Sequence, residues 1–492
     1  MAAADVTRFD QSADIVVVGF GCAGLAVAVT AWRAGAETLI LEKQAPDAHT
    51  PSTRMSGGLT MATTDVAKAA TYLDRCAGGM VPKDVSEAWA ARATGVIDWL
   101  HAIAPELDMR PVARAEHPEF EGSEALVVYQ PGGAKKRLDP AGKTGPFLWE
   151  KLTTNFHALT GIPVLWQSPV GRLMRNHAGR IIGVETTDGR RIGARKGVVL
   201  CCGGYLHDSR MKRDYLRTWP VYFYGNPGNT GDGVRLAQEV GADLWHMNQM
   251  IGRAIGNFQL EDGTDLPIML FLNPPGYVIT DRYGKRFADE SAQANLLHGF
   301  YYHLLAVDPH TGETPRNPCF WFFDERRRRA GMLTFSLLGA HAVGIYTWSE
   351  DNSAEIARGW IASGSTIAEA AAAAGVSDPA AAEAEVAAYN AICRTGSSDP
   401  FGRPVDTMVP LDEGPFYCVR LYPGGSNTTG GPRRNARAQI LDTRGDPIPG
   451  LYAAGELGQG TGMLYPADGS NLSEGFCFGQ IAAESALADN AS

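Results

Sequence analysis

The stretch Asp14-Ile-Val-Val-Val-Gly-Phe-Gly-Cys-Ala-Gly24 decides the fold. Its first five residues form an apolar, β-branched run that is typical of a buried parallel strand. Three glycines follow at the spacing Gly-x-Gly-x-x-Gly, and residues 25–34 are rich in Ala and Val and predict a helix. A second strand is expected over residues 37–41, and it ends in Glu42. A strand, a glycine turn, a helix and a later acidic residue together indicate a dinucleotide-binding unit of Rossmann type.

Each feature of that unit has a physical task. Gly19 permits the tight turn, and Gly21 lets the backbone approach a pyrophosphate at the helix N-terminus. Gly24 allows the helix to pack closely on the strand, and Glu42 can accept hydrogen bonds from a ribose. The sequence therefore predicts an α/β fold that binds a dinucleotide.

Further strand signals occur well downstream of this unit. Residues 180–185 and 190–194 predict a hairpin around the turn pair Asp188-Gly189. Residues 198–200 are apolar and lead into Gly203-Gly204, and residues 451–456 form a similar run that ends at Glu456. Between them, residues 365–374 and 379–393 have helical periodicity. The expected order is a nucleotide-binding part, an inserted segment, and a return to the nucleotide-binding part.

Composition excludes several classes of protein. The chain has 492 residues and a formal net charge of −10, so it is a poor candidate for binding nucleic acid or an anionic membrane. The basic run from Arg326 to Arg329 is expected to be a solvated helix face or a salt-bridge cluster. No run of 18 apolar residues predicts a transmembrane helix, and no signal peptide or metal-binding cluster is expected. Eight cysteines without a Cys-x-x-Cys pair favour reduced thiols in a cytoplasmic protein.

Several motifs, taken together, resemble the FAD-dependent family of flavoprotein fumarate reductases and 3-ketosteroid dehydrogenases. They are Gly19 to Gly24 with Glu42-Lys43, Ser56-Gly57-Gly58, Val199 to Tyr205, Asn229 to Gly233, Gly284 to Glu290, Thr429-Gly430-Gly431 and Ile448 to Glu456. The resemblance implies an FAD-binding domain of glutathione-reductase type, made from residues 1–275 (with inserted segments around 100–150) and 406–492. It also implies an inserted α+β substrate-binding cap over residues 276–405.

The same resemblance implies which residues hold the cofactor. Ser56, Gly57 and Gly58 would lie near the isoalloxazine ring, Asp232 at the flavin-side backbone and Glu456 at the ribityl chain, although Asp232 could instead cap a helix. Covalent attachment of FAD is not expected, because His49 is misplaced for the motif that carries it. The implied cofactor-binding set is Gly19, Gly21, Ala23, Gly24, Glu42, Lys43, Ser56, Gly57, Gly58, Gly203, Gly204, Asp232, Gly455, Glu456, Ser470 and Leu472.

The C-terminal motif favours the 3-ketosteroid dehydrogenase branch of the family. A dicarboxylate reductase needs cations that clamp its substrate, but residues 421–429 contain no His and residues 457–480 contain no Arg, Lys or His. In their place stands Tyr465-Pro-Ala-Asp-Gly469, which resembles the Tyr-Pro-x-x-Gly element of the steroid branch. In that branch the Tyr hydroxyl and the Gly N–H donate to the keto oxygen of the substrate.

The general base is less clearly marked in the sequence. The resemblance implies a tyrosine in the cap, but residues 291–297 contain none. Tyr301, Tyr302 and Tyr346 come later, and Asp468 is another acid–base candidate. Aromatic residues of the insertion are expected to give a pocket for a bulky apolar ligand, unless they are plain core: Phe300, Phe320, Trp321, Phe322, Phe323 and Trp348.

The sequence therefore predicts an FAD-dependent dehydrogenase that introduces a C=C bond α,β to a ketone. The substrate expected is a 3-ketosteroid (Δ4 or Δ1 product) or a smaller cyclic ketone, with an external electron acceptor. The alternatives are a flavin-dependent reductase of an enone or unsaturated acid, and a flavin-binding protein without turnover.

Overall fold

The strand, turn and helix expected at residues 14–41 are present in the computed structural model, which describes residues 8–132, 145–272, 276–295, 297–334 and 346–489. Strand β1 (Gln11–Val18) leads into helix α1 (Cys22–Arg33), and β2 (Thr38–Leu41) follows. Both strand contacts of β1 are parallel, with Val16 opposite Leu39 of β2 on one side and opposite Val198 on the other. The sequence pattern therefore marks the centre of a sheet.

This first sheet has eight strands, in the order β19-β20-β9-β1-β2-β6, with the β7–β8 hairpin joined to β9. The hairpin predicted around Asp188-Gly189 is confirmed, since β8 and β9 pair antiparallel with Val184 opposite Ile192. Residues 190–194 and 198–200, expected as separate strands, are one continuous strand. The remaining members are β6 (Val164–Leu165), β7 (Val170–Arg175), β8 (Ile181–Thr186), β9 (Arg191–Leu200), β19 (Gln439–Leu441) and β20 (Pro447–Ala453).

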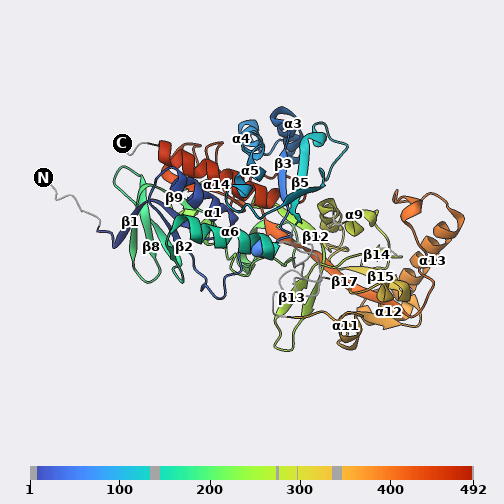
Figure 1. The fold of residues 1–492 in the computed structure, drawn as a ribbon. Helices are drawn as coiled ribbons and strands as arrows, with labels where there is room; N and C mark the ends of the chain where they lie inside the picture. The colour runs from blue at the N-terminus through green and yellow to red at the C-terminus, as the bar shows by residue number, and fades with distance from the viewer. Residues whose placement is uncertain (1–7, 133–144, 273–275, 296, 335–345, 490–492) are drawn as a thin grey trace.

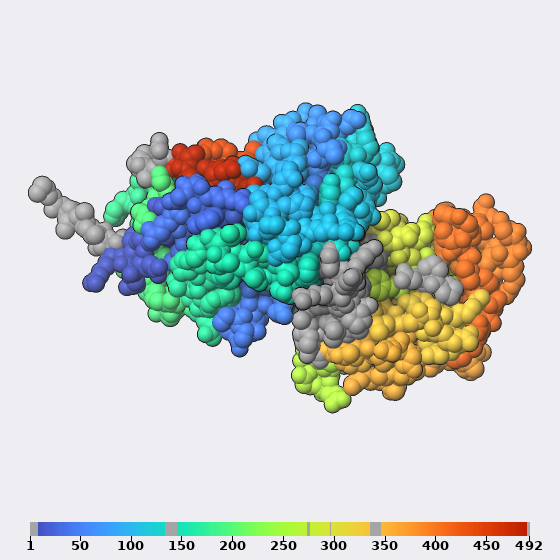
Figure 2. All heavy atoms as spheres, in the orientation of Figure 1, coloured from blue at the N-terminus to red at the C-terminus, as the bar shows by residue number. Residues whose placement is uncertain are grey.

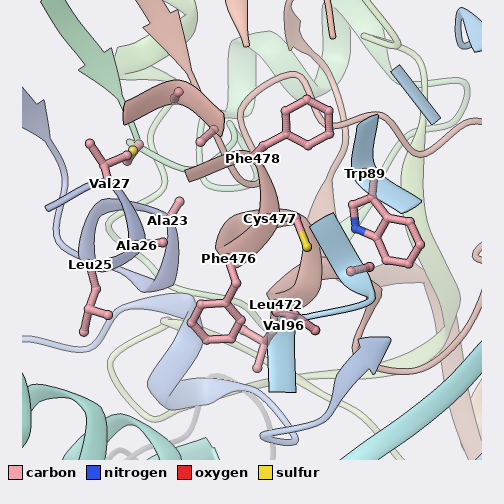
Figure 3. Packing of buried hydrophobic residues seen from close by; sticks show 14 of the residues in the cluster. Ala23, Leu25, Ala26, Val27, Trp89, Val96, Leu472, Phe476, Cys477 and Phe478 are labelled. Atoms are coloured by element: carbon pink, nitrogen blue, oxygen red, sulfur yellow. The ribbon is translucent and has the colours of Figure 1, made fainter. Parts of the chain in front are cut away.

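Helix α14 (Ser470–Ala488) packs against α1 and brings the C-terminal part of the chain back to the first sheet (Figure 1). The two helices approach closely because glycines face α1: a Cβ on Gly475 would lie 2.4 Å from Cys22 Sγ, and one on Gly479 would lie 2.7 Å from the Ala23 carbonyl. Figure 3 shows Phe476, Cys477 and Phe478 of α14 among the buried side chains of this core.

Other helices and two small sheets complete the first lobe. One three-stranded antiparallel sheet has the order β3-β5-β4, and one two-stranded sheet pairs β11 with β18. The elements are α2 (Ser52–Met55), β3 (Thr60–Thr63), α3 (Val66–Ala77), α4 (Lys83–Ala93), α5 (Val96–His101), β4 (Met109–Ala113), η1 (Ser123–Ala125), β5 (Leu126–Pro131), α6 (Gly145–Thr160), α7 (Ser209–Tyr215), α8 (Asp232–Glu239), β11 (Leu244–Trp245) and β18 (Gly431–Pro432).

A seven-stranded, mainly antiparallel sheet forms the centre of a second lobe, which is coloured yellow to orange at the right of Figure 2. Its order is β13-β12-β17-β15-β14, and β10 and β16 also pair with β17. The strands are β10 (Tyr222–Phe223), β12 (Met250–Gln259), β13 (Asp265–Ile268), β14 (Val278–Thr280), β15 (Cys319–Asp324), β16 (Ala362–Gly364) and β17 (Phe416–Thr428).

This sheet is wider than the insertion expected over residues 276–405. That range supplies β14, β15 and β16, but β10, β12 and β13 precede it and β17 follows it. The difference arises because sequence motifs mark where a cofactor is bound, whereas strand pairing between distant segments leaves no local signal.

Helices cover the second sheet, and capping residues fix where two of them begin. Thr366 caps the N-terminus of helix α12 (Ile367–Ala374), and its side chain accepts from Glu369 N. Asp378 caps α13 (Pro379–Thr395) in the same way by accepting from Ala381 N. Both helices were predicted from the sequence. The other elements are α9 (Ser291–Ala294), η3 (His298–Leu305), α10 (Glu325–Arg329), α11 (Ser353–Ala357) and η4 (Val405–Thr407).

The arginine run in α10 is the salt-bridge cluster that was expected. Arg326 pairs with Asp324 at 2.7 Å, and Arg329 pairs with Glu413. Arg327 is buried, and its guanidinium donates to the Phe271 and Gly331 carbonyls. The run therefore ties segments of the second lobe together.

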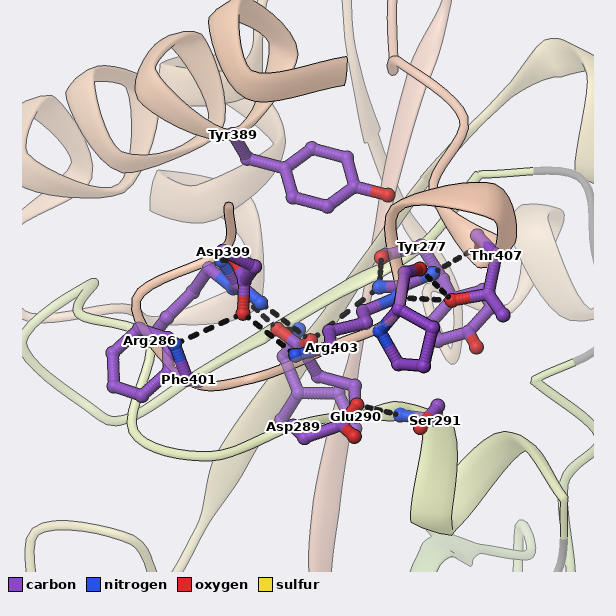
Figure 4. A network of polar contacts seen from close by, with 12 residues as sticks. Tyr277, Arg286, Asp289, Glu290, Ser291, Tyr389, Asp399, Phe401, Arg403 and Thr407 are labelled. Carbon is purple, nitrogen blue, oxygen red and sulfur yellow. Dashed lines mark hydrogen bonds and ion pairs between the residues drawn. The ribbon is translucent and has the colours of Figure 1, made fainter. Parts of the chain in front are cut away.

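A second ionic network is buried beneath α13 (Figure 4). Arg286 donates to both oxygens of Glu290, at 2.6 and 2.8 Å, and to Asp399 at 2.6 Å. Arg403 donates to the Tyr277 carbonyl at 2.9 Å. All four charged side chains are at most 1% exposed, so the loop that carries Asp399 and Arg403 is fixed to the strands below it.

Candidate functional site

A cavity of about 110 Å³ opens at the carboxyl ends of the parallel strands. Val18 of β1 and Leu41 of β2 line it, as does the N-terminus of α1. Ligands of open α/β sheets bind at such a position, where strand ends and helix N-termini meet. Among the predicted cofactor-binding residues, the structure brings together here Gly19, Gly21, Ala23, Glu42, Lys43, Gly203, Asp232, Gly455 and Glu456.

The three motif glycines have separate roles in shaping this cavity. Gly19 has φ +104°, and a Cβ there would lie 2.5 Å from the Cys201 carbonyl oxygen. Gly24 faces away from the cavity, where a Cβ would lie 2.1 Å from the Gly19 oxygen. At Gly21, in contrast, no protein atom lies closer than 3.5 Å to such a Cβ. Packing of the protein alone therefore leaves the space beside Gly21 for a ligand.

Glu42 lies beside the glycine turn, and Lys43 reaches the other wall of the cavity. The Glu42 carboxylate accepts from the amides of Phe20 and Gln44, both at 2.9 Å. Burial alone would raise the pKa of Glu42, but the nearby His49 imidazole and the hydrogen bonds from these two amides lower it, so the carboxylate is ionised at neutral pH. Lys43 Nζ donates to Asp232 Oδ2 at 2.6 Å. Asp232 is the first residue of α8 rather than its cap, which is Gly231.

Glu456 is the most perturbed acid in this cavity. Burial raises its pKa to about 8, although the nearby Gly204 amide and hydrogen bonds from Asn229 and Ser52 oppose the rise. Oε2 accepts from Asn229 Nδ2 at 3.0 Å, whereas Oε1 is buried and has no hydrogen-bond partner among the described residues. Gly204 lies against this carboxyl, since a Cβ there would be 2.8 Å from Oε1. An orphaned buried oxygen at a cavity wall indicates that a ligand completes its hydrogen bonding.

A second cavity, of about 330 Å³, continues from the first. Cys22, Ser52, Thr53 and Glu456 line both cavities, so a long ligand can pass from one to the other. The second cavity lies between the two lobes, with walls from both. Its lining includes Ser56, Gly57, Gln130, Tyr224, Arg253, Met269, His298, Asn427, Tyr465, Asp468, Gly469, Asn471 and Leu472.

Tyr465, Asp468 and Gly469 are brought together at this second cavity. The Tyr465 hydroxyl accepts the Asn471 N–H at 3.4 Å, which leaves its own proton available to an acceptor. Burial is the main cause that raises the pKa of Tyr465, so the hydroxyl keeps its proton at neutral pH. Gly469 has φ +84°, where a Cβ would lie 2.6 Å from the Leu59 carbonyl carbon, and it precedes α14. Asp468 is exposed, so the cavity reaches the molecular surface beside it.

The tyrosines considered as the general base do not line the cavity. The Tyr302 hydroxyl donates to the Met463 carbonyl, and the Tyr346 hydroxyl donates to Glu355 Oε1 at 2.6 Å. Tyr301 packs in the hydrophobic core, with its ring against Gly252. The structure places each of these phenols in packing within the fold, and only Asp468 among the proposed bases lies at the cavity.

The aromatic pocket expected from the insertion is also absent from the described lining. Phe300, Trp321, Phe323 and Trp348 belong to one core cluster of the second lobe, and Phe320 and Phe322 belong to another. Residues 319–324 form a central strand, so their side chains are buried on both faces of the sheet. These aromatics are core, and the cavity lining combines other apolar side chains with several polar ones.

The structure adds four residues that the sequence analysis missed. Arg253 of β12 and His298 of η3 line the second cavity, and Glu116 holds the His298 imidazole at 2.9 Å. Tyr224 lines the same cavity. The only signal in the sequence is a lone arginine within the apolar strand 250–258, and it lies outside the segments in which a substrate-binding cation was sought.

Three other predicted residues lie behind the cavity walls. Gly24 and Gly204 contact backbone and side chains there, as described, and the Gly58 amide donates to Ser56 Oγ at 3.0 Å. Ser470 lines neither of the two cavities, and its buried hydroxyl has no hydrogen-bond partner within the described ranges. His49, misplaced for covalent attachment, lies 3.6 Å from Glu42 and lines the first cavity but not the second.

The residues present fit FAD. The ionised Glu42, the room beside Gly21 and the orphaned Glu456 Oε1 match the needs of a ribose, a pyrophosphate and a polyhydroxyl chain, respectively. No helix in the described part of the chain has the length and apolar character to cross a membrane.

Comparison with known proteins agrees with this geometry. Residues 14–472 match the family described as FAD binding domain. The digoxin reductase of Eggerthella lenta is 26% identical over 532 residues, which cover 96% of this chain and 87% of that protein. The 4-oxocyclohexanecarboxylate 2-dehydrogenase of Sinomonas cyclohexanicum is 26% identical over 557 residues, which cover 95% of this chain and 92% of that protein.

A solved structure has the same fold. The 3-ketosteroid delta1-dehydrogenase from Sterolibacterium denitrificans, in complex with 1,4-androstadiene-3,17-dione, matches with a TM-score of 0.81 at 20% identity. The match covers 97% of this chain and all of that one. The same architecture is thus found around a bound steroid dione in that protein.

Proposed function

The chain belongs to the FAD binding domain family, and from that premise we propose that it desaturates a cyclic ketone, forming a C=C bond between the carbons α and β to the carbonyl. It is an FAD-dependent oxidoreductase, of the type that includes ketosteroid dehydrogenases. The observation that carries the proposal is the pair Tyr465 and Gly469 on the wall of a cavity that is continuous with the cofactor groove.

Tyr465 and Gly469 bind the carbonyl oxygen of the substrate. The phenol, whose pKa burial raises, donates its proton in a hydrogen bond, and Gly469 has no side chain of its own beside its N–H. Two donors at a carbonyl oxygen stabilise the negative charge that develops there when the α-proton leaves. Because both donors are neutral, they select a ketone rather than a carboxylate at this position.

Asp468 accepts the α-proton. It is adjacent to Gly469 in sequence and lines the same cavity, and its exposure lets it return the proton to solvent. FAD, when bound, supplies the acceptor for the hydride that leaves the β-carbon. Thr53 lines both cavities, and Ser56, Gly57 and Leu472 form part of the wall of the second one.

The residues that would hold FAD without a covalent bond follow the two cavities. Gly19, Gly21 and Ala23 would lie at the pyrophosphate, and Glu42 would accept from the adenosine ribose. Glu456 would meet the ribityl hydroxyls through Oε1, the oxygen that lacks a protein partner.

The cavity lining supports a small ketone rather than a steroid. A steroid buries a large apolar surface and needs an apolar pocket. The described walls combine apolar side chains such as Met55, Leu59, Met269 and Leu472 with the polar groups of Arg253, His298, Asn427 and Asn471. A six-membered cyclic ketone suits this lining better than a four-ring skeleton.

Reduction of an enone is the second candidate, because the same groups would catalyse the reverse reaction. The relative named digoxin reductase supports it. Assays with a reduced dye and an enone, and with an oxidised dye and a saturated ketone, decide which direction is faster.

Anaerobic bleaching tests the proposal. The yellow protein should lose its flavin absorbance on addition of a cyclohexanone-type compound, and Tyr465→Phe should slow this reaction about 100-fold, the cost of removing one donor from an oxyanion site. Asp468→Asn should slow it as well. Tyr302→Phe is the matched control, because its hydroxyl donates to a carbonyl outside the cavity. No bleaching by any cyclic ketone, together with no reoxidation by any enone, would refute the proposal.

A further inference from the structure

Arg253 is a buried cation at the second cavity that has no anionic partner in direct contact. It is 6% exposed. Its Nη2 donates to His298 Nε2 at 2.6 Å, its Nη1 meets only the Met269 sulfur at 3.5 Å, and its Nε has no hydrogen-bond partner. Within the described residues, no carboxylate forms an ion pair with this guanidinium. A buried charge in this state costs several kcal/mol of stability unless something pairs with it.

The nearest acid is held one residue away. Glu116 Oε2 lies 2.9 Å from His298 Nδ1, and Glu116 Oε1 accepts the His298 amide at 2.6 Å. Since arginine can only donate, His298 Nε2 accepts and the ring proton is on Nδ1. Burial and the Arg253 charge lower the pKa of His298, which agrees with a neutral ring. Glu116 thus holds His298 in place, and His298 holds Arg253 in place. The Glu116 carboxylate itself does not contact the guanidinium.

Arg253 Nη1 shares its weak acceptor, the Met269 sulfur, with a second donor. The Tyr224 hydroxyl donates to the same Met269 sulfur at 3.6 Å, and Tyr224 lines the cavity beside Arg253. A thioether is a weak acceptor on a flexible side chain, so a stronger acceptor can displace it. A carboxylate offers two oxygens that can accept from the guanidinium and from the phenol, and its charge strengthens these hydrogen bonds.

The cation lies close to the proposed ketone donors. The His298 ring, which Arg253 contacts, packs edge-on against the Tyr465 ring with 4.4 Å between ring centroids. The Tyr465 ring and the Arg253 guanidinium therefore both contact the His298 imidazole. A molecule that reaches both has its ketone and its anionic group on opposite sides of a small ring.

We propose that Arg253, positioned by Glu116 and His298, binds a carboxylate of the substrate, and that the substrate is a cyclic oxo acid. The inference rests on the proposed ketone desaturation for the identity of the reacting group, but the anion site stands on the contacts of Arg253 alone. Arg253 lies outside residues 421–429 and 457–480, the segments that contain no candidate cation for the substrate.

Binding of an unreactive acid tests the site separately from the chemistry. The FAD-loaded protein should bind cyclohexanecarboxylate, measured by calorimetry and by the change in the flavin spectrum, at least about 30-fold more tightly than cyclohexanecarboxamide, as one charge-assisted pair requires. Arg253→Met should abolish that preference, and Arg253→Lys should keep part of it, since a point charge lacks the second donor. Equal binding of the acid and the amide by the natural protein would overturn the proposal.

Turnover tests the substrate class. The ratio of kcat/KM for 4-oxocyclohexanecarboxylate to that for its methyl ester should exceed about 30 and should fall toward unity in Arg253→Met. The matched control is Arg420→Met, which removes an exposed arginine from β17 of the same sheet. If no ketone is oxidised but cyclohexanecarboxylate still binds through Arg253, the proposed function fails and the anion site remains. If the ester is oxidised as fast as the acid, the proposed anion site fails and the proposed function remains.

Discussion

Glu456 shows at the scale of one residue how a binding site is prepared before its ligand arrives. Its carboxyl is buried with one oxygen unpaired, and burial raises its pKa to about 8 from an ordinary value near 4.5. A folded-state pKa above the unfolded one means that the native protein binds this proton more tightly, so FAD-free protein loses stability as the pH rises from about 4.5 to about 8.

Glu456→Gln removes this titration. We expect the free energy of unfolding of the variant, relative to the natural protein, to grow through that pH window and to level off above it, by a few kcal/mol in all. Urea unfolding of FAD-free protein at a series of pH values measures it. Glu42→Gln is a control for which the opposite pH dependence is expected. Because the pKa of Glu42 is lowered, removing its carboxylate should decrease the free energy of unfolding at neutral pH, and this decrease should disappear in acid. A pH-independent difference for Glu456→Gln would contradict the expectation.

Residues that act through sequence-distant partners were the ones that the sequence could not supply. Gly19, Glu42, Tyr465 and Asp468 stand in motifs with fixed local spacing, and the structure brings them to two connected cavities. Arg253 and His298 belong to different elements, and each is unremarkable in its own segment. Only strand pairing and the turn of η3 bring them into contact, so no local pattern announces them.

At the scale of elements, the contact between α1 and α14 decides whether the glycine turn is held in place. Gly479 of α14 leaves room for the backbone of α1, where a Cβ would lie 2.7 Å from the Ala23 carbonyl and from Ala26 Cβ. Sequence reasoning predicted the strand, turn and helix of this region, because an apolar run and Gly-x-Gly-x-x-Gly have a local cause. It did not predict which later helix would cover α1.

Gly479→Val should therefore push the two helices apart. We expect it to lower the free energy of unfolding by about 1–3 kcal/mol, the usual cost of overpacking a tight core, and to weaken FAD retention. Urea unfolding followed by flavin fluorescence checks both effects. Ala488→Val, at an exposed position near the end of the same helix, should change neither. Equal effects of the two variants would show that the close approach is unimportant.

At the scale of the whole molecule, two sheets with separate cores meet at the second cavity. The buried network of Arg286, Glu290, Asp399 and Arg403 lies wholly in the second lobe (Figure 4). The sequence motif Gly284 to Glu290, which contains Arg286, resembles the family pattern. No pattern in the sequence marks residues 399–403 as the ionic partners of this motif. Their role is to fix the loop that closes one side of that lobe.

Arg286→Met leaves two buried carboxylates without their main partner, which costs about 3–5 kcal/mol. We expect the second lobe to unfold at lower urea concentration, seen by tryptophan fluorescence, while flavin release shifts less. Arg282→Met removes a half-exposed arginine from the same lobe and should shift neither probe appreciably. If both probes move together by the same amount in Arg286→Met, the two lobes unfold as one unit.

Strand β17 has a consequence for recombination between relatives. It lies at the centre of the second sheet between β12 and β15, yet β12 precedes the segment that sequence motifs mark as inserted, β15 lies within that segment, and β17 itself follows it. Transplanting residues 276–405 alone from a relative would ask foreign strands to pair with a native β17, and excising them would leave β17 with an open edge that invites aggregation. A chimaera that exchanges substrate preference should therefore be cut before β10 and after β17, at about residues 222 and 428, so that Arg253 travels with the sheet on which it stands.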